Sequence, residues 1–266
     1  MNLKTGSWLI VFLSVAAFSG RLWAESGGTG PTIDPEAEKL LRRLSESIKA
    51  TKHYAFIVID TIDEVQENGR KLQFSHVRTA TISRPDRMKV ITTGDFANRS
   101  CWKDKKTFTL LDRDENVYGQ IKSPGTIEET MDFLLERYAT FTPLADLLSE
   151  DIYSVLTDRA LEIRYVGLHH AAGIKCHHLA GTQEDLDWQV WIDSEEEPHF
   201  RKLVITYKLL PGQPQYSAVL QDFEDLPSRP GEDVFKFEPP PGAERIKFMP
   251  MISKRESASA KRKGGD

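Results

Sequence analysis

The stretch His53–Ser83, HYAFIVIDTIDEVQENGRKLQFSHVRTATIS, determines the fold. Its two parts, His53–Gln66 and Arg70–Ser83, are rich in β-branched and aromatic residues that alternate with a period of two, which is typical of strands. Between them lies Asn68-Gly69, a pair that favours the tight turn of a β-hairpin. The stretch therefore predicts two long antiparallel strands.

The same alternation recurs along most of the chain. We expect further strands at Arg87–Thr93, Arg99–Lys103, Thr107–Asp112, Val117–Ile121, Leu161–Leu168, Ile174–Thr182, Trp188–Asp193, Lys202–Leu209, Gln215–Phe223 and near Val234–Phe237. Consecutive strands joined by short turns pair antiparallel, and a sheet of about eleven strands must curl or close. The pattern predicts an α+β fold with a single, strongly curved antiparallel sheet.

Helical patterns occur at three places. Asp34 is a candidate N-cap before Pro35, and apolar residues at helical spacing follow it over residues 35–50. Thr126 and Glu129 form a capping box that begins a second helix, and Thr142-Pro143 begins a shorter third helix. Because these segments have apolar stripes, we expect the helices to cover the concave face of the sheet.

Residues 1–24 have the order of a secretory signal peptide. Lys4 gives a positive start, Trp8–Phe18 is a short apolar run, and small residues precede a cut after Ala24. A cut after Ser19 and an uncleaved anchor are the alternatives. The run is shorter than the roughly 20 residues that span a bilayer, so we expect no stable membrane insertion. The expected location is the periplasm of a Gram-negative envelope.

Composition divides the rest of the chain into three parts. Residues 25–33 predict a flexible Gly-rich lead-in, residues 34–250 a single folded domain, and residues 251–266 a basic, disordered tail. The whole chain has 35 Lys and Arg against 40 Asp and Glu, a formal net charge of -5. Phosphate binding needs a basic excess, so nucleic acid is not expected as a partner.

Several motifs resemble a known family of exported proteins. Ser83–Val90 (SRPDRMKV), Asp104–Asp112 (DKKTFTLLD) with Asn116-Val117-Tyr118, and Trp188–Asp193 (WQVWID) with Pro198 and Arg201-Lys202-Leu203 resemble strands of the LolA-like outer-membrane lipoprotein carrier fold. A closer resemblance is to the bacterial family of predicted periplasmic proteins called domain of unknown function 2092. It is carried by Pro143–Leu148, Cys176–Ala180 and Leu203–Lys208, and it covers most of residues 40–248.

The resemblance implies an open β-barrel whose helices close its mouth and whose cavity holds acyl chains. Strand alternation separates two faces without indicating which one lines the cavity, so a filled core is the alternative. The candidate ligand-binding residues are Leu72, Phe74, Met88, Val90, Phe108, Leu110, Met131, Leu134, Leu135, Leu147, Trp188, Val190, Leu203 and Ile205.

The expected function is non-covalent binding of a hydrophobic ligand, either a lipid or an acylated lipoprotein, by a monomer. No G-x-S-x-G, H-E-x-x-H, P-loop or G-x-G-x-x-G motif is present, so we expect neither catalysis nor a cofactor. One alternative is an envelope module that senses stress or binds a partner protein without lipid. A second is a metal-binding protein that uses the Cys176/His178 hairpin, with His169 or His170 opposite.

Cys101 and Cys176 are the two cysteines of the chain. Export permits a disulfide between them. Both lie in strand-like segments that are distant in sequence, so a short Cα–Cα distance does not follow from the pattern. Two buried thiols are the expected state, and a disulfide is the alternative.

Overall fold

The computed structural model describes residues 30–138, 144 and 149–248. Within these residues the chain forms thirteen strands, three α-helices and one 3-10 helix, η1 (Glu232–Phe235). The helices are α1 (Pro35–Ala50), α2 (Ile127–Tyr138) and α4 (Ile152–Thr157). The strands are β1 (Thr32–Ile33), β2 (His53–Val65), β3 (Lys71–Ser83), β4 (Arg87–Gly94), β5 (Asn98–Lys103), β6 (Thr107–Asp112), β7 (Val117–Lys122), β8 (Glu162–Ala171), β9 (Ile174–Thr182), β10 (Leu186–Asp193), β11 (Phe200–Tyr207), β12 (Gln215–Asp225) and β13 (Glu244–Ile246).

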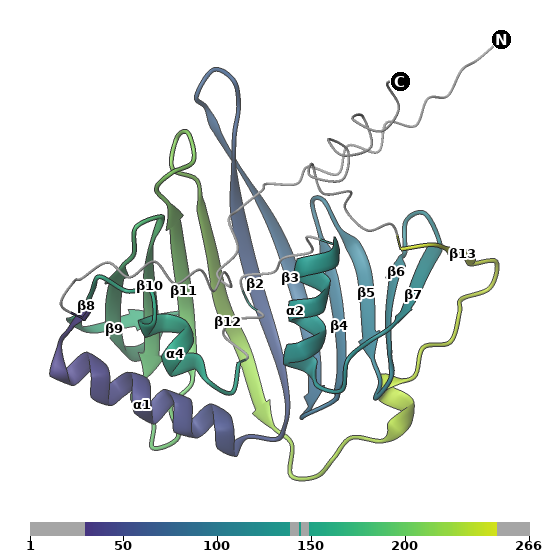
Figure 1. Ribbon diagram of the computed structural model, residues 1–266, viewed down its shortest axis with the longest axis horizontal. Helices are drawn as coiled ribbons and strands as arrows, with labels where there is room; N and C mark the ends of the chain where they lie inside the picture. The colour runs from purple at the N-terminus through teal and green to yellow at the C-terminus, as the bar shows by residue number, and fades with distance from the viewer. Residues whose placement is uncertain (1–29, 139–143, 145–148, 249–266) are drawn as a thin grey trace, which may run out of the picture.

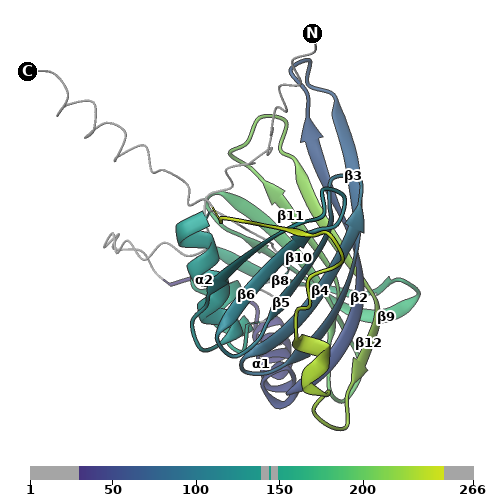
Figure 2. The same ribbon diagram turned by 90° about the vertical axis from the view of Figure 1, so that its right-hand side faces the viewer.

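All strands belong to one sheet, in the order β1-β8-β9-β10-β11-β12-β2-β3-β4-β5-β6-β7-β13. Two meanders, β2–β7 and β8–β12, are joined where β12 pairs with β2. The two edge strands do not pair with each other, so the sheet is open. It curls around the helices, which lie on its concave side (Figures 1 and 2). The predicted curved, helix-covered sheet is confirmed.

The β2–β3 hairpin forms as its sequence predicts. Each strand has 13 residues, and the register runs from His53 opposite Ser83 to Val65 opposite Lys71. Gly69 takes a φ of 80°, which a residue with a Cβ rarely adopts. This hairpin is the longest pair of strands in the sheet, and both of its outer edges are paired with neighbouring strands.

The first two helices also begin where their sequences predict. The Asp34 carboxylate accepts a hydrogen bond of 2.8 Å from the Glu36 backbone N–H. At α2 the capping box is reciprocal, because Glu129 N–H donates to Thr126 Oγ1 at 3.1 Å and Thr126 N–H donates to Glu129 Oε2 at 2.9 Å. The third predicted helix lies outside the described residues, apart from Leu144. Helix α4 was not predicted, because six residues are too few to show a helical period.

The sheet is antiparallel except at its two edges. There β1 pairs parallel with β8, and β13 pairs parallel with β7, which corrects the expectation of a purely antiparallel sheet. These two strands have only two and three residues, too few to show alternation. Strand β1 includes the last two residues of the segment predicted as a flexible lead-in.

The last predicted strand, Val234–Phe237, is wrong. The segment begins within η1 and leaves it after Phe235. Its alternating apolar residues instead make two separate contacts. Phe235 is buried in the protein, whereas the ring of Phe237 lies about 5 Å from the rings of Trp102 and Tyr118, with centroid distances of 5.0 and 4.9 Å.

The main core lies between the sheet and the helices. Helices α1 and α4 lie over β8–β12, and α2 lies over β3 and β4 (Figure 1). Trp188 belongs to this core, whereas Trp191 belongs to a small second cluster with Cys176 and Ala171 on the opposite, convex face. The two rings lie on opposite faces because Trp188 and Trp191 are three residues apart in one strand. Within the described residues no helix is long and apolar enough to cross a membrane.

Candidate ligand-binding face

Strand register defines the concave face, because directly opposed residues lie on the same side of a sheet. On β2 this face carries Tyr54, Phe56 and Val58, all buried in the main core. Pairing continues the face through Ile82 on β3 in one direction and Leu220 on β12 in the other. A ligand that enters the open barrel would contact this face.

The structure places all ten candidate residues that lie on strands on the concave face. Six of the fourteen candidates are closed inside the core: Met88, Phe108, Leu134, Trp188, Val190 and Leu203. Seven are only half-buried: Leu72, Phe74, Val90, Leu110, Met131, Leu135 and Ile205. Leu147 lies outside the described residues. The face is thus partly filled core and partly accessible apolar surface.

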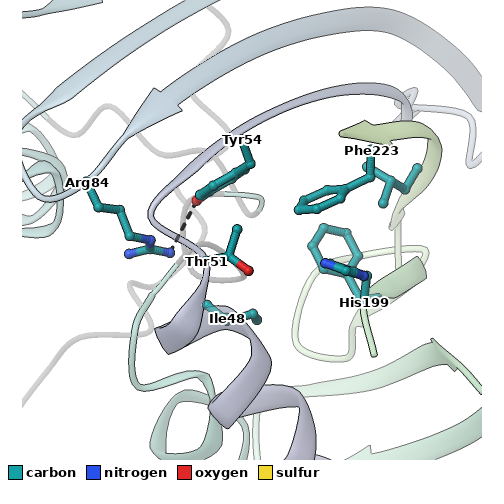
Figure 3. Close-up of a pocket in the computed structure, with 8 residues that line it drawn as sticks. Ile48, Thr51, Tyr54, Arg84, His199 and Phe223 are labelled. Atoms are coloured by element: carbon teal, nitrogen blue, oxygen red, sulfur yellow. Dashed lines mark hydrogen bonds between the residues drawn. The ribbon is translucent and has the colours of Figure 1, made fainter. Parts of the chain in front are cut away.

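A pocket of about 360 Å³, including its part open to solvent, lies at one end of the concave face (Figure 3). It is built where the last turn of α1 meets β2, the β3–β4 turn, the β10–β11 loop and β12. None of the thirteen candidates within the described residues lines it. The lining residues are Ile48, Thr51, Tyr54, Arg84, His199, Phe200, Leu220 and Phe223.

Arg84 forms one side of the pocket and is held in place by several partners. Its guanidinium donates to the Tyr54 hydroxyl at 3.2 Å and lies 5.6 Å from the centre of that ring. Its Nη1 is 3.6 Å from a carboxylate oxygen of Glu150 and 3.9 Å from one of Glu128. Burial raises the pKa of Tyr54, so the phenol stays protonated. The buried guanidinium of Arg84 therefore lies beside the aromatic ring of Tyr54.

His199 forms the opposite side of the pocket, with its ring centre 4.0 Å from that of Phe223 (Figure 3). Its backbone N–H donates to Asp193 Oδ1 at 3.2 Å, and Asp193 also binds Arg201 at 2.7 Å, which fixes the loop. Burial lowers the pKa of His199, so the ring is neutral at pH 7. Among the described residues, its buried Nε2 has no hydrogen-bond partner.

A charged cluster interrupts the apolar concave face in the middle of the sheet. Asp60, on β2, is 1% exposed and accepts hydrogen bonds from Arg78 Nε at 2.5 Å and from His76 Nδ1 at 3.3 Å. Arg78 also donates to Thr92 on β4. Burial raises the pKa of Asp60, but these hydrogen bonds outweigh it and hold the pKa below its ordinary value. The cluster ties three neighbouring strands together.

The β8–β9 hairpin brings some of the predicted metal ligands together on the convex face. Cys176 is opposite His169 in the register, and Cys176 and His178 share a strand face, as predicted. The Cys176 thiol donates to the Ile174 carbonyl at 3.3 Å. Within the described part of the chain, no group of three or more His, Cys, Asp or Glu side chains is arranged to hold a metal ion. The predicted alternative thus lacks a complete ligand set.

Both cysteines are free thiols. Cys101 faces the main core on the concave side, and burial raises its pKa to about 12. Cys176 belongs to the small cluster on the convex side. Because the sheet separates them, the alternative of a disulfide does not hold in this structure.

The described residues form one open, strongly curved and mostly antiparallel sheet with α-helices on its concave side. The chain itself belongs to the family of predicted periplasmic proteins (DUF2092), whose sequence profile matches residues 37–249. The periplasmic location expected from the sequence is confirmed by this membership. No curated protein matches the chain.

Several solved structures are similar to this one at low sequence identity. An uncharacterized conserved protein from Thermus thermophilus has a TM-score of 0.46 and 9% identity over 80% of this chain and 99% of its own. LprF from Mycobacterium bovis has a TM-score of 0.47 and 13% identity over 76% of this chain and 99% of its own. A chain of the Pseudomonas aeruginosa MucA/MucB complex has a TM-score of 0.42 and 17% identity over 76% of this chain and 61% of its own.

Proposed function

We propose that the protein binds a hydrophobic ligand, a lipid or the acyl chains of a lipoprotein, on its concave face without catalysing a reaction. The pocket at the end of α1 carries this proposal. It is a small recess, open to solvent, at the end of the concave face. Five of its eight lining residues, Ile48, Tyr54, Phe200, Leu220 and Phe223, are aliphatic or aromatic.

Apolar burial supplies the affinity. Each methylene of an acyl chain that enters the pocket contributes about 0.8 kcal/mol. The half-buried Val90, Leu110 and Ile205 extend the apolar surface along the concave face. Arg84 lines the pocket as a buried cation, which suits a chain that carries a polar or anionic head.

Filling the pocket tests the proposal. Ile48 lines the pocket and is only half-buried, so Ile48→Trp fills the space with little disturbance of the core. Ile59→Trp is the matched control, because Ile59 is 39% exposed on the convex face. With a fluorescent palmitate analogue as the probe, we expect Ile48→Trp to weaken binding at least tenfold and Ile59→Trp to leave it unchanged.

Thermal melts establish that both variants are folded before binding is compared. Equal affinity of Ile48→Trp and the wild-type protein would reject this pocket. Leu134→Trp on α2 then tests the remainder of the concave face, since Leu134 is buried there. Unchanged binding in both variants would reject the concave face altogether.

The alternative of a protein-interaction module is favoured by one observation on the other side of the sheet. Ile59 and Val77 are directly paired and are 39% and 43% exposed on the convex face, which no α-helix covers within the described residues (Figure 2). Native mass spectrometry of protein from its own periplasm separates the two functions. A co-purifying lipid supports the carrier function, whereas an apo mass that persists after envelope lipids are added back supports the interaction module.

A further inference from the structure

Two imidazole rings meet on the convex face, on the side of the sheet opposite the pocket. His169 comes from β8 and His178 from β9, and their Nδ1 atoms are 3.0 Å apart. The ring centres are 5.1 Å apart, and the ring planes are inclined by 59°. His169 is exposed to solvent, whereas His178 is buried at its base. One ring of the pair is therefore free to turn.

The surroundings of His178 prepare its Nδ1 as an electron-pair donor. The Gln189 side-chain oxygen lies 3.1 Å from His178 Nε2, so Nε2 carries the proton and Nδ1 carries the lone pair. Metal-binding histidines are held in this way by a carbonyl or carboxylate on the second ring nitrogen. The ring of His178 also stacks on Trp191, with centres 4.0 Å apart and planes inclined by 11°. Both contacts fix the direction of Nδ1.

Coordination changes the protons of the pair, because a ring nitrogen binds a metal ion through its free lone pair. Binding would end the hydrogen bond within the pair, because His169 must move its proton from Nδ1 to Nε2 before both Nδ1 atoms can coordinate.

The separation of the two nitrogens selects a class of metal ion. Metal–nitrogen bonds to histidine are about 2.0–2.1 Å long. If the His169 ring turns to aim its lone pair at a shared ion and the two nitrogens keep their separation of 3.0 Å, they subtend an angle of about 90° at that ion. That angle suits square-planar or octahedral geometry better than the tetrahedral geometry that zinc prefers. Square-planar sites with nitrogen and oxygen ligands are typical of Cu²⁺ and Ni²⁺.

We propose that His169 and His178 together bind one Cu²⁺ or Ni²⁺ ion on the convex face, with Gln189 as the positioning residue. Each Nδ1 donates one electron pair, and water occupies the remaining positions, because no third His, Cys, Asp or Glu completes the set in the described part of the chain. The site is open and its ion exchangeable. It does not depend on the hydrophobic pocket, which lies on the other face.

Titration of untagged protein with Cu²⁺ and with Ni²⁺ by isothermal calorimetry tests the proposal. We expect one ion per chain, and at least a tenfold loss of affinity in both His169→Ala and His178→Ala. Gln189→Leu should weaken binding roughly tenfold or more, because it removes the acceptor that orients His178. His170→Ala and His177→Ala are matched controls on the same hairpin and should bind like the wild-type protein.

Electron paramagnetic resonance of the Cu²⁺ complex gives a second readout, in which coupling to two imidazole nitrogens is expected. The proposal is overturned if no stoichiometric binding occurs, if His169→Ala binds like the wild-type protein, or if the two controls lose as much affinity as the two ligand variants. His169 is exposed, so its variant should fold and decides the outcome even if His178→Ala does not fold.

Discussion

Gly181 shows how a single residue shapes the core beneath α1. It lies on β9 directly opposite Trp188 on β10, and the indole ring covers it. A Cβ at this position would be 2.2 Å from two carbons of that ring, far inside van der Waals contact. Trp188 is 2% exposed, so the ring has no room to move away. The small residue and the large one form a single packing unit.

We therefore predict that Gly181→Ala destabilises the protein by about 1–3 kcal/mol, the usual cost of overpacking a core. Urea denaturation measures the change in the free energy of unfolding. Gly231→Ala is the control, because a Cβ at that position would have no other atom within 4 Å. Gly173→Ala would not serve, because Gly173 has a φ of 81°, which strains any residue with a Cβ. Trp188→Leu should recover part of the loss when combined with Gly181→Ala. Equal stability of Gly181→Ala and the wild-type protein would contradict this packing.

His199 predicts a loss of stability in mild acid. Because burial lowers its pKa below the ordinary value of 6.5, the unfolded chain binds the proton more readily than the folded one. Stability is therefore complete above pH 6.5 and falls as the pH decreases below it. We expect the urea midpoint to decrease between pH 7.5 and pH 5, and to decrease less in His199→Gln. Burial also lowers the pKa of His178, so His199→Gln should keep part of the decrease of the urea midpoint with falling pH.

The exposed His170 supplies the control for this pH dependence. His170→Gln should retain the wild-type slope, because its side chain is exposed and does not line the pocket. Parallel slopes for the wild-type protein and His199→Gln would show that His199 does not contribute.

At the level of single residues, alternation grouped the strand candidates on one face without indicating which face the helices cover. The structure shows that Val90, Leu110 and Ile205 lie on the helix-covered side. The pocket depends on contacts that alternation does not describe, because an α1 end, a turn and a loop meet there from distant parts of the chain. Arg84 lies within a family-like motif, and His199 lies beside one. Neither pattern indicates a ligand by itself.

At the level of elements, helix α1 depends on the residue that begins it. Asp34 accepts a hydrogen bond from the Glu36 N–H at 2.8 Å, and its own backbone N–H donates to the Ile163 carbonyl on β8. The side chain thus caps the helix while the backbone attaches it to the sheet. Leu40, Leu41 and Leu44 of this helix are almost fully buried in the core.

We predict that Asp34→Ala lowers the free energy of unfolding by about 1 kcal/mol, the typical loss of an N-cap. Asp34→Asn keeps an acceptor at the same position and should retain most of the stability. Chemical denaturation of both variants measures the difference. A similar loss in the two variants would show that the charge of Asp34, rather than its capping bond, is what stabilises α1.

Long elements could be predicted from the sequence, and short ones could not. The β2–β3 hairpin and the capped α1 and α2 repeat their pattern over 12 residues or more, so local preference and burial agree. Helix α4, η1 and the edge strands are too short to repeat their own patterns. The structure of these short elements is set by the residues that they contact. Phe235 and Phe237 are an example, because they alternate as in a strand but are held by separate contacts.

At the level of the whole molecule, the open sheet has two edges that need cover. Strand β13 pairs with β7 through Glu244–Ile246 and shields part of its backbone. The opposite edge has the two-residue β1. Short strands at both edges limit the backbone available for pairing with a second chain. The expectation of a monomer stays a prediction.

We predict that a chain ending at Ala243 forms dimers or larger species at micromolar concentration, because it exposes the β7 backbone. Size-exclusion chromatography with light scattering measures the mass. The truncation also removes Phe248, whose ring lies 6.2 Å from that of Phe108 and 5.4 Å from that of Tyr138. Phe248→Ala in the full chain is therefore the control and should remain monomeric. A monomeric truncated chain would show that β13 does not protect the edge.

The pairing of β2 with β12 has a consequence for how the chain matures. Ile62 pairs with Tyr216, so the central seam of the sheet joins strands about 150 residues apart, and such distant pairing is slow. A chain that leaves a secretion channel with its N-terminus first completes the β2–β7 meander while β12 is still inside. Until β12 arrives, the edge of β2 that it pairs with, Tyr54–Ile62, stays unpaired. We expect this interval, rather than the folded state, to be the period when the protein needs a chaperone.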